Sequence, residues 1–162
     1  MLGDSSFDDL VTKAPVNLQQ SSPDWGGVTA ALQAEGITPS SVLAVSWCDF
    51  SSANIEANID PTILAVVYPA GILATAGKRK MMGGGIKYST IAFQRCKTYG
   101  PTEYVDNRGY GKYCIDFCGA GSVLLGRLEW DWKGKRFGDS RPQMLAAAEE
   151  RDRILEVVTP LI

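Results

Sequence analysis

The 162-residue chain contains no histidine. Histidine is the commonest general base in enzymes and a frequent ligand of zinc, so its absence removes the usual catalytic triads, Cys-His dyads and histidine-containing metal sites. Carboxylates, lysines, tyrosines and cysteines remain, but their spacing matches no catalytic or metal-binding motif. We therefore expect a protein without catalytic residues, a bound metal or a cofactor.

The sequence also lacks a long apolar run. Its longest apolar stretches, residues 42–45 and 62–67, are far shorter than the roughly 20 residues that a membrane-spanning helix needs. The first ten residues include three aspartates and have neither the basic start nor the apolar core of a secretory signal. These absences predict a soluble, cytoplasmic protein.

Cysteines are few. The four at Cys48, Cys96, Cys114 and Cys118 have the spacing neither of a zinc site nor of a disulfide-stapled secreted domain. On one straight strand Cys114 and Cys118 would be about 13 Å apart along the chain, too far to bond to each other. We interpret all four as reduced thiols.

Basic residues are almost missing from the first half of the chain. Residues 1–77 contain one basic and eight acidic residues, a net charge of −7, whereas residues 78–141 contain thirteen basic and six acidic residues, a net charge of +7. Either the two parts neutralise each other, or the second presents a positive surface to an anionic partner. The net charge of −2 for the whole chain argues against nucleic acid as the main partner.

Short strand patterns followed by one helix make up most of the sequence. Runs rich in β-branched and aromatic residues, separated by glycine, proline and asparagine turns, predict about seven strands. The expected strands cover residues 42–50, 62–68, 72–76, 86–97, 103–106, 112–118 and 122–132. This order of elements predicts an α+β fold that is mainly β, with a small barrel or sandwich capped by the final helix.

Three helices are expected outside the strands. A short one near residues 4–14 and a second one between Ser22 and Gly36 form an N-terminal extension. In the second helix, Trp25, Val28, Ala31 and Leu32 recur at helical spacing and form the face expected to pack on the β core. Gly36 followed by Ile37 is a C-terminal stop signal for this helix.

The last helix is expected over residues 140–158. Ser140 and Gln143 form a capping box, and Pro142 lies in the first turn. One face is apolar and the other charged. The apolar face consists of Met144, Ala147, Ala148, Ile154, Leu155 and Val158. We expect this face to be buried against the strands.

Residues 62–97 resemble a bacterial PH-like or GRAM-like domain. The resemblance depends on an Ile-Leu-Ala-Val-Val-Tyr strand at residues 63–68, a second strand at residues 71–75, and an Ile-Lys-Tyr-Ser-Thr-Ile strand at residues 86–91. It extends over about residues 42–158. It implies a seven-stranded PH-like domain in residues 41–162, capped by the C-terminal helix, after the helical extension in residues 1–40. It also implies a binding module that performs no reaction.

The expected activity is recognition of a protein or peptide, or self-association. An exposed sheet edge or a groove beside the final helix would provide the surface. The first alternative is binding of an anionic small molecule, a lipid headgroup or a membrane surface at a basic hairpin in residues 78–87. Lys78, Arg79 and Lys80 precede three glycines there, and the candidate ligand-binding residues are Lys78, Arg79, Lys80, Lys87 and Arg95. The same residues also suit a solvated hairpin tip.

Two further groups of residues have two interpretations each. Trp130 and Trp132 share one strand face and would either stack a ligand or pack against the final helix. Asp49 and Asp116 lie within apolar strands, where a buried carboxylate would support a small enzyme, whereas pairing with arginine would leave it structural. A carboxylate-based enzyme is therefore the second alternative.

Overall fold

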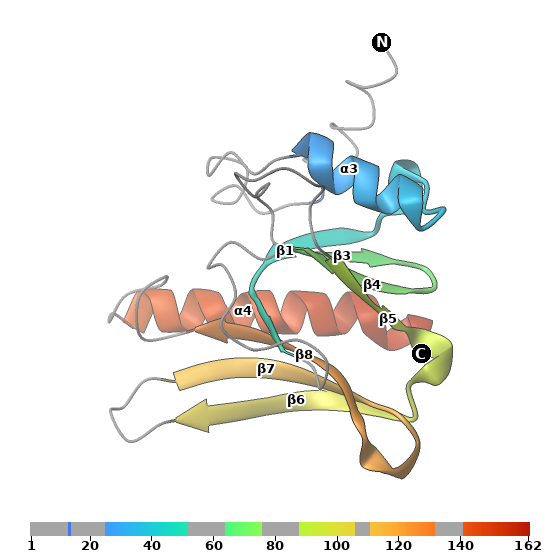
Figure 1. Ribbon diagram of the computed structural model, residues 1–162. Helices are drawn as coiled ribbons and strands as arrows, with labels where there is room; N and C mark the ends of the chain where they lie inside the picture. Colours follow the sequence, from blue (N-terminus) through green and yellow to red (C-terminus); the bar gives the residue numbers. More distant parts are fainter. Residues whose placement is uncertain (1–12, 14–24, 52–63, 76–87, 106–110, 132–140) are drawn as a thin grey trace, which may run out of the picture. The chain divides into compact units, whose positions relative to one another are not determined.

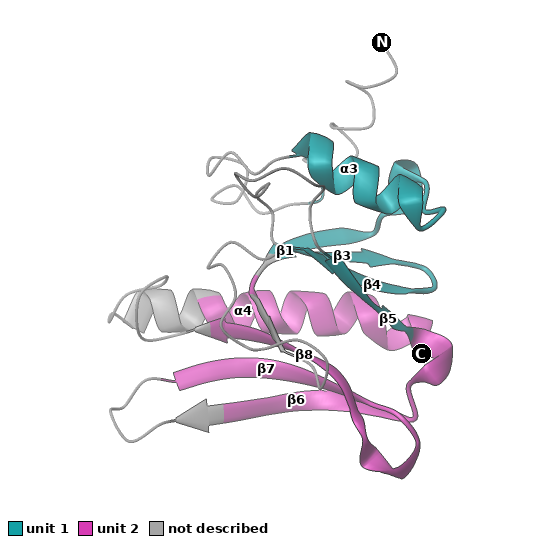
Figure 2. Cartoon of the chain, viewed as in Figure 1, with its two compact units in different colours: residues 1–47, 58–92 teal, residues 48–57, 93–162 magenta. Residues whose placement is uncertain are grey.

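The structure is a computed structural model that describes residues 13, 25–51, 64–75, 88–105, 111–131 and 141–162. At residues 47, 49–51, 104–105, 131 and 141–146 it describes the backbone alone. The chain divides into two compact units (Figure 2): unit 1 comprises residues 1–47 and 58–92, and unit 2 comprises residues 48–57 and 93–162. Each unit contains one antiparallel sheet and one helix of ten residues or more.

Unit 1 contains a four-stranded sheet in the order β1-β3-β4-β5, in which all neighbours are antiparallel (Figure 1). Its strands are β1 (Ala44–Trp47), β3 (Leu64–Tyr68), β4 (Gly71–Thr75) and β5 (Tyr88–Ala92). Every residue of β4 is buried, so both faces of this strand are covered. The turn at Pro69 and Ala70 joins β3 to β4, as the sequence predicts.

Helix α3 (Trp25–Ala34) packs on one face of this sheet. The 3-10 turn η1 (Pro39–Ser41) leads from it toward β1. The buried cluster joins the helix, the following turn and three strands through Val28, Ala31, Leu32, Ile37, Val42, Val45, Leu64, Val66 and Leu73, with Trp25 packed at its margin. The helical spacing of Trp25, Val28, Ala31 and Leu32 is thus confirmed as the packing face of α3.

The end of α3 has the geometry of a Schellman motif. Gly36 has a φ of +72°, its N–H donates to the carbonyl of Gln33 at 3.0 Å, and the N–H of Ile37 donates to the carbonyl of Leu32 at 2.8 Å. The left-handed conformation suits glycine because it has no Cβ. Ile37 is then carried into the buried cluster, which confirms the predicted stop signal.

We expect the substitution Gly36→Ala to lower the free energy of unfolding by about 1 kcal/mol, because an alanine resists the left-handed conformation. An added Cβ would contact nothing within 4 Å, so strain in the backbone is the whole effect. Urea denaturation followed by circular dichroism measures it. Gln33→Ala on the exposed side of α3 is the control, and equal stability of the two variants would contradict the prediction.

Unit 2 contains a second four-stranded antiparallel sheet, in the order β2-β8-β7-β6. Its strands are β2 (Asp49–Ser51), β6 (Thr98–Val105), β7 (Gly111–Cys118) and β8 (Leu124–Asp131). Three short 3-10 turns accompany them: η2 (Phe93–Arg95), η3 (Ala120–Ser122) and η4 (Thr159–Leu161). Cys114 on β7 lies opposite Thr102 on β6 and Glu129 on β8, which sets the register of the sheet.

Helix α4 (Arg141–Val158) packs against β6, β7 and β8. Its buried residues recur along one face: Ala147, Arg151, Ile154 and Val158. The guanidinium of Arg151 lies 5.2 Å from the centre of the Tyr113 ring, so the sheet face that carries Tyr113 is the one covered by α4. The prediction of one buried helix face is confirmed, although Ala148 and Leu155 are half-buried.

The described strands form two open sheets and no closed barrel. The described residues form eight short strands in place of the predicted seven, because the strand expected over residues 42–50 divides into β1 and β2. The coarser prediction, an α+β fold with antiparallel strands and a C-terminal helix, is confirmed. None of the helices in the described part of the chain is long and apolar enough to cross a membrane.

The prediction of one strand over residues 42–50 is wrong. β1 ends at Trp47 and pairs with β3, whereas β2 starts at Asp49 and pairs with β8 in the other unit. An apolar run indicates a covered strand, but it carries no information about which partner the strand takes. The break at Cys48 therefore depends on pairing with residues distant in sequence.

The prediction of one strand over residues 86–97 is also wrong. β5 ends at Ala92, the 3-10 turn η2 follows, and β6 starts at Thr98, five residues earlier than expected. β6 includes Pro101, a residue that argues against a central strand. Proline is tolerated here because β6 is an end strand of its sheet and pairs with β7 alone among the described strands.

Candidate functional site

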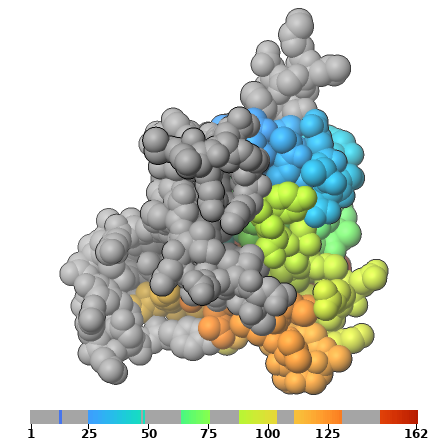
Figure 3. All heavy atoms as spheres, viewed as in Figure 1, coloured from blue at the N-terminus to red at the C-terminus, as the bar shows by residue number. Residues whose placement is uncertain are grey.

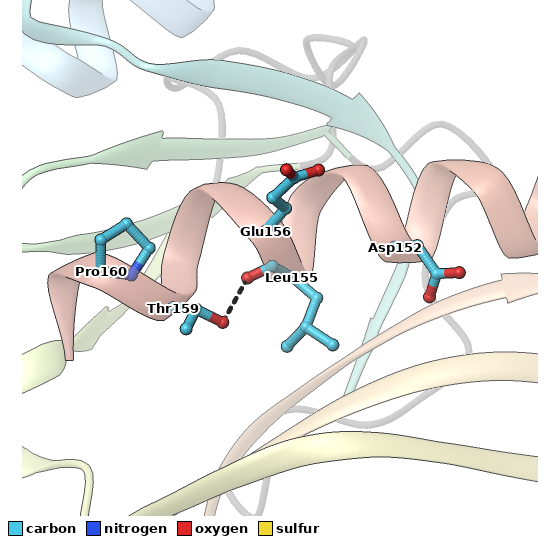
Figure 4. Close-up of a pocket in the computed structure, with 5 residues that line it drawn as sticks. All are labelled: Asp152, Leu155, Glu156, Thr159 and Pro160. Carbon is cyan, nitrogen blue, oxygen red and sulfur yellow. Dashed lines mark hydrogen bonds between the residues drawn. The ribbon is translucent and has the colours of Figure 1, made fainter.

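A shallow groove runs along the last two turns of α4 and the turn η4 (Figure 4). Its volume is about 400 Å³. Five described residues line it: Asp152, Leu155, Glu156, Thr159 and Pro160. All five belong to unit 2, so the groove is a local feature of its C-terminal segment.

Proline determines where the helix stops and thereby forms one end of the groove. α4 ends at Val158, and Pro160 follows in η4. A proline has no N–H and its ring would collide with the carbonyl four residues earlier, so the helix cannot continue through Pro160. The hydroxyl of Thr159 donates to the carbonyl of Leu155 at 2.8 Å and closes the last turn (Figure 4).

An acidic stripe of α4 extends into the groove. Glu149, Asp152 and Glu156 are exposed and lie three and four residues apart on this stripe, and Asp152 and Glu156 also line the groove. The side chain of Asp152 is 64% exposed although it accepts a 2.7 Å bond from Arg151. The basic residue on this outer surface, Arg153, is engaged by Glu150 through contacts of 2.7 and 2.8 Å. The groove therefore has apolar walls at Leu155 and Pro160 beside negative charge.

Arg151 is the buried charged residue that connects α4 to the sheet. It is 8% exposed, and its terminal nitrogen donates to the carbonyls of Thr102 at 3.3 Å and Cys114 at 3.5 Å. From the sequence, Arg151 was assigned to neither face of the helix, so its burial was missed. Its spacing of four residues from Ala147 and three from Ile154 places it on the apolar face and was the signal available.

The sheet face opposite α4 carries a set of ion pairs. Arg127 binds Asp116 with two contacts, of 2.6 and 3.2 Å, and Lys112 lies 3.6 Å from Glu129. Cys114 lies between these pairs and is fully buried. Burial, followed by the negative charge of Glu129, raises the pKa of its thiol to about 12. The thiol is therefore protonated at neutral pH and unsuited to act as a nucleophile.

The carboxylates considered for catalysis do not lie opposite each other. Asp116 is paired with Arg127, as one of its two interpretations predicted. Asp49 lies opposite Glu129 in β8, and its side chain is outside the described residues. Among the side chains that the structure describes, no three acidic or thiol groups are close enough to hold a metal ion.

The predicted anion-binding residues are mostly outside the described residues. Lys78, Arg79, Lys80 and Lys87 fall in residues 76–87, which the structure does not describe. Arg95 is exposed at the end of η2. Whether these five residues lie together is therefore not tested by the described part of the chain, and the anionic-ligand alternative stays a prediction.

Trp130 is a core residue. It is fully buried in β8 and lies directly opposite Tyr113, on the face that α4 covers. This position agrees with the interpretation that its indole packs against the final helix. Several other predictions, on Trp132, the capping box at Ser140, the side chain of Met144 and the short helix of residues 4–14, lie outside the described residues.

Comparison with known proteins gives no relative for this chain. No protein-family model, curated protein or solved structure matches it.

Proposed function

We propose that the chain is a non-catalytic binding module that recognises a protein partner through the groove on α4 and η4. The main observation in support is that Leu155 and Pro160 line an open groove whose other lining residues include the carboxylates Asp152 and Glu156. Small-molecule sites usually enclose most of their ligand. An open groove on a helix suits side chains from the surface of another protein.

The charge of the groove defines the partner. Because the exposed charged groups on its side of α4 are acidic, a complementary partner presents lysine or arginine next to an apolar side chain. The apolar side chain would cover Leu155 and Pro160, and the cation would approach Glu156. Such pairing raises the association rate and disfavours acidic partners.

We further propose that this module is PH-like. The strand motifs of residues 63–91 support this assignment, since their order resembles that family. The cover of one antiparallel sheet by a C-terminal helix supports it as well. PH-like domains mostly bind other molecules, which agrees with a role in recognition.

We expect peptides selected from a random displayed library against the intact protein to carry a basic residue within three positions of an apolar one. Glu156→Lys should weaken binding of such a peptide about tenfold, because attraction becomes repulsion at the groove. Rising salt should weaken binding to the original protein too. Fluorescence anisotropy of a labelled peptide measures both effects.

Glu149→Lys is the matched control, since it makes the same charge change on the same stripe but outside the lining of the groove. It should weaken binding less than threefold, by long-range electrostatics alone. Equal loss in the two variants, or selected peptides without a basic residue, would contradict the proposed function.

A further inference from the structure

The sheet of unit 1 ends at β5, which among the described strands pairs with β4 alone. An end strand has a row of backbone N–H and C=O groups that its own sheet does not use. We propose that this row joins two copies of the chain into a dimer, in which β5 of one copy pairs with β5 of the other in antiparallel orientation. The proposal is independent of the groove on α4, because β5 belongs to unit 1 and the groove to unit 2.

The register of the sheet shows which residues of β5 direct their backbone groups outward. Thr90 ends a row of residues that lie opposite one another on successive strands: Val45, Val66, Leu73 and Thr90. In an antiparallel sheet the N–H and C=O of one residue point to the same side, so hydrogen-bonded and non-hydrogen-bonded pairs alternate along such a row. The N–H of Val45 donates to the carbonyl of Lys13 at 3.1 Å and is therefore not used toward β3. Val66 and Leu73 are then the hydrogen-bonded pair, and Thr90 points away from β4.

A close contact at Gly71 agrees with this alternation. A Cβ built on Gly71 in β4 would lie 2.2 Å from the carbonyl oxygen of Ile91, so the backbone of Ile91 faces β4. Successive residues of a strand direct their backbone groups to alternate sides. Thr90, next to Ile91, therefore directs its N–H and C=O to the outside of the sheet. None of the described residues forms a backbone hydrogen bond with these two groups.

The outer side of β5 is accessible. Thr90 and Tyr88 are exposed, whereas Val45, Val66 and Leu73, the other members of the row, are buried under α3. In Figure 3 the yellow-green atoms of the segment that begins with β5 lie at the surface beside the blue atoms of α3. A strand of another molecule can thus approach β5 from its outer side.

The other three end strands of the two described sheets are protected against such pairing. β1 is engaged by Lys13 through the bond to Val45, and β2 is only three residues long. β6 includes Pro101, which has no N–H, and the exposed charge of Glu103. Covered edges, very short strands, prolines and charges are the means by which natural sheets avoid joining one another. β5 is five residues long and contains neither a proline nor a charged residue.

The sequence of β5 suits a second copy of itself as the partner. A twofold axis beside Thr90 places Thr90 of one copy opposite Thr90 of the other, and Tyr88 opposite Ala92. Each Thr90 then donates its N–H to the carbonyl of the other Thr90. Opposed threonines stabilise antiparallel pairs, whereas opposed like charges destabilise them. Because β5 carries no charge, the pairing places no like charges of the two strands opposite each other.

The paired strands by themselves form a small interface, so the dimer is expected to be weak. At ~3.3 Å per residue they are about 17 Å long, and they bury less than the roughly 1,200 Å² of a stable complex. We expect a dissociation constant of about 0.1–1 mM. The average mass of the full chain, measured by small-angle X-ray scattering, should therefore rise with concentration. A mass that stays at the 17.5 kDa of one chain up to about 2 mM would overturn the proposal.

Charged variants of Thr90 test both the strand and its register. Thr90→Lys and Thr90→Glu each place like charges opposite each other and should weaken association at least about tenfold. An equimolar mixture of the two variants should associate at least as tightly as the original protein, because lysine then lies opposite glutamate. Thr90→Val is the uncharged control and should stay within about twofold of the original protein.

The side chain of Thr90 is exposed, so these variants should remain folded, which circular dichroism checks. Original association in Thr90→Lys would overturn the proposal. So would a mixture of the lysine and glutamate variants that stays monomeric, because the pairing then has no twofold axis beside Thr90.

Amide hydrogen exchange of the ¹⁵N-labelled full chain, followed by NMR, separates this dimer from one formed by another surface. In the monomer the N–H of Thr90 faces solvent and should exchange rapidly, whereas the N–H of Ile91 points to β4 and should be protected. In the dimer the N–H of Thr90 gains a hydrogen bond, so its exchange should slow about twofold or more from dilute to concentrated samples. Association without slower exchange at Thr90 would assign the dimer to another surface and overturn the proposal. Glu156→Lys should leave association unchanged, so failure of this dimer and failure of the groove on α4 are distinguishable.

Discussion

Replacement of Trp130 by alanine is expected to lower the free energy of unfolding of unit 2 by about 3–5 kcal/mol. The indole is fully buried, and it belongs to the sheet face that α4 covers, opposite Tyr113. Its removal loses apolar contacts on β8 and leaves a cavity that the rigid strands cannot fill. Denaturation in urea, monitored by circular dichroism, measures the loss.

Val123→Ala provides the control for this substitution. Val123 is 58% exposed and lies just before β8, so its truncation should change stability by less than about 0.5 kcal/mol. A loss at Trp130 no larger than the loss at Val123 would contradict the assignment of Trp130 to the core of unit 2. It would return the indole to the candidates for ligand stacking.

Unit 2 is expected to lose stability in alkaline solution through the ionisation of Cys114. Burial, with the charge of Glu129, raises the pKa of this thiol from 9.0 to about 12 in the folded protein. Below pH 9 the thiol is protonated in both the folded and unfolded states, so it does not make the free energy of unfolding depend on pH. Between pH 9 and 12 the unfolded state releases the proton and the folded state keeps it, so the free energy of unfolding falls by about 1.4 kcal/mol per pH unit.

The difference between the original protein and Cys114→Ala isolates this effect, because lysines and tyrosines titrate equally in both. The original protein should lose roughly 3 kcal/mol more than Cys114→Ala between pH 8.5 and pH 11. Val123→Ala is the control, since it removes an exposed side chain that carries no ionisable group, and it should keep the original slope. Parallel pH curves for the original protein and Cys114→Ala would contradict a raised pKa at Cys114.

The surroundings of Trp130 and Cys114 explain why we assign recognition to the outer surface of α4 and not to the sheet of unit 2. One sheet face of unit 2 is filled by Trp130 and its neighbours under the helix. The opposite face is occupied by the Asp116–Arg127 and Lys112–Glu129 pairs around a buried thiol. Paired charges satisfy each other and have little left to offer a ligand. The groove instead exposes the apolar side chains of Leu155 and Pro160 beside two carboxylates.

Local patterns accounted for α3, its stop at Gly36, and the buried face of α4 over its described side chains. Each depends on residues within one or two turns, so helical spacing and the conformational preference of glycine suffice to predict them. The strands β3, β4 and β7 were predictable for the same reason, since each is a short apolar or alternating run between turn residues.

Strand pairing between distant parts of the chain explains why the strands predicted over residues 42–50 and 86–97 were wrong. Residues 42–50 supply strands to both sheets, and whether they continue past Cys48 depends on β3 and β8, which come much later in the chain. Likewise, β6 forms through Pro101 because β7 provides eight register partners on one side. Arg151 was missed because its burial depends on the Tyr113 ring and on the carbonyls of two strands.

The amino-acid order alone determined which segments become helices and strands, where α3 stops, and that one side of α4 is buried, because these properties arise from neighbours along the chain. The tertiary structure decided that the described strands form two open sheets and that Arg151 is buried against the sheet of unit 2. Those outcomes depend on hydrogen bonds and contacts between residues far apart in sequence, whose energies no local pattern contains.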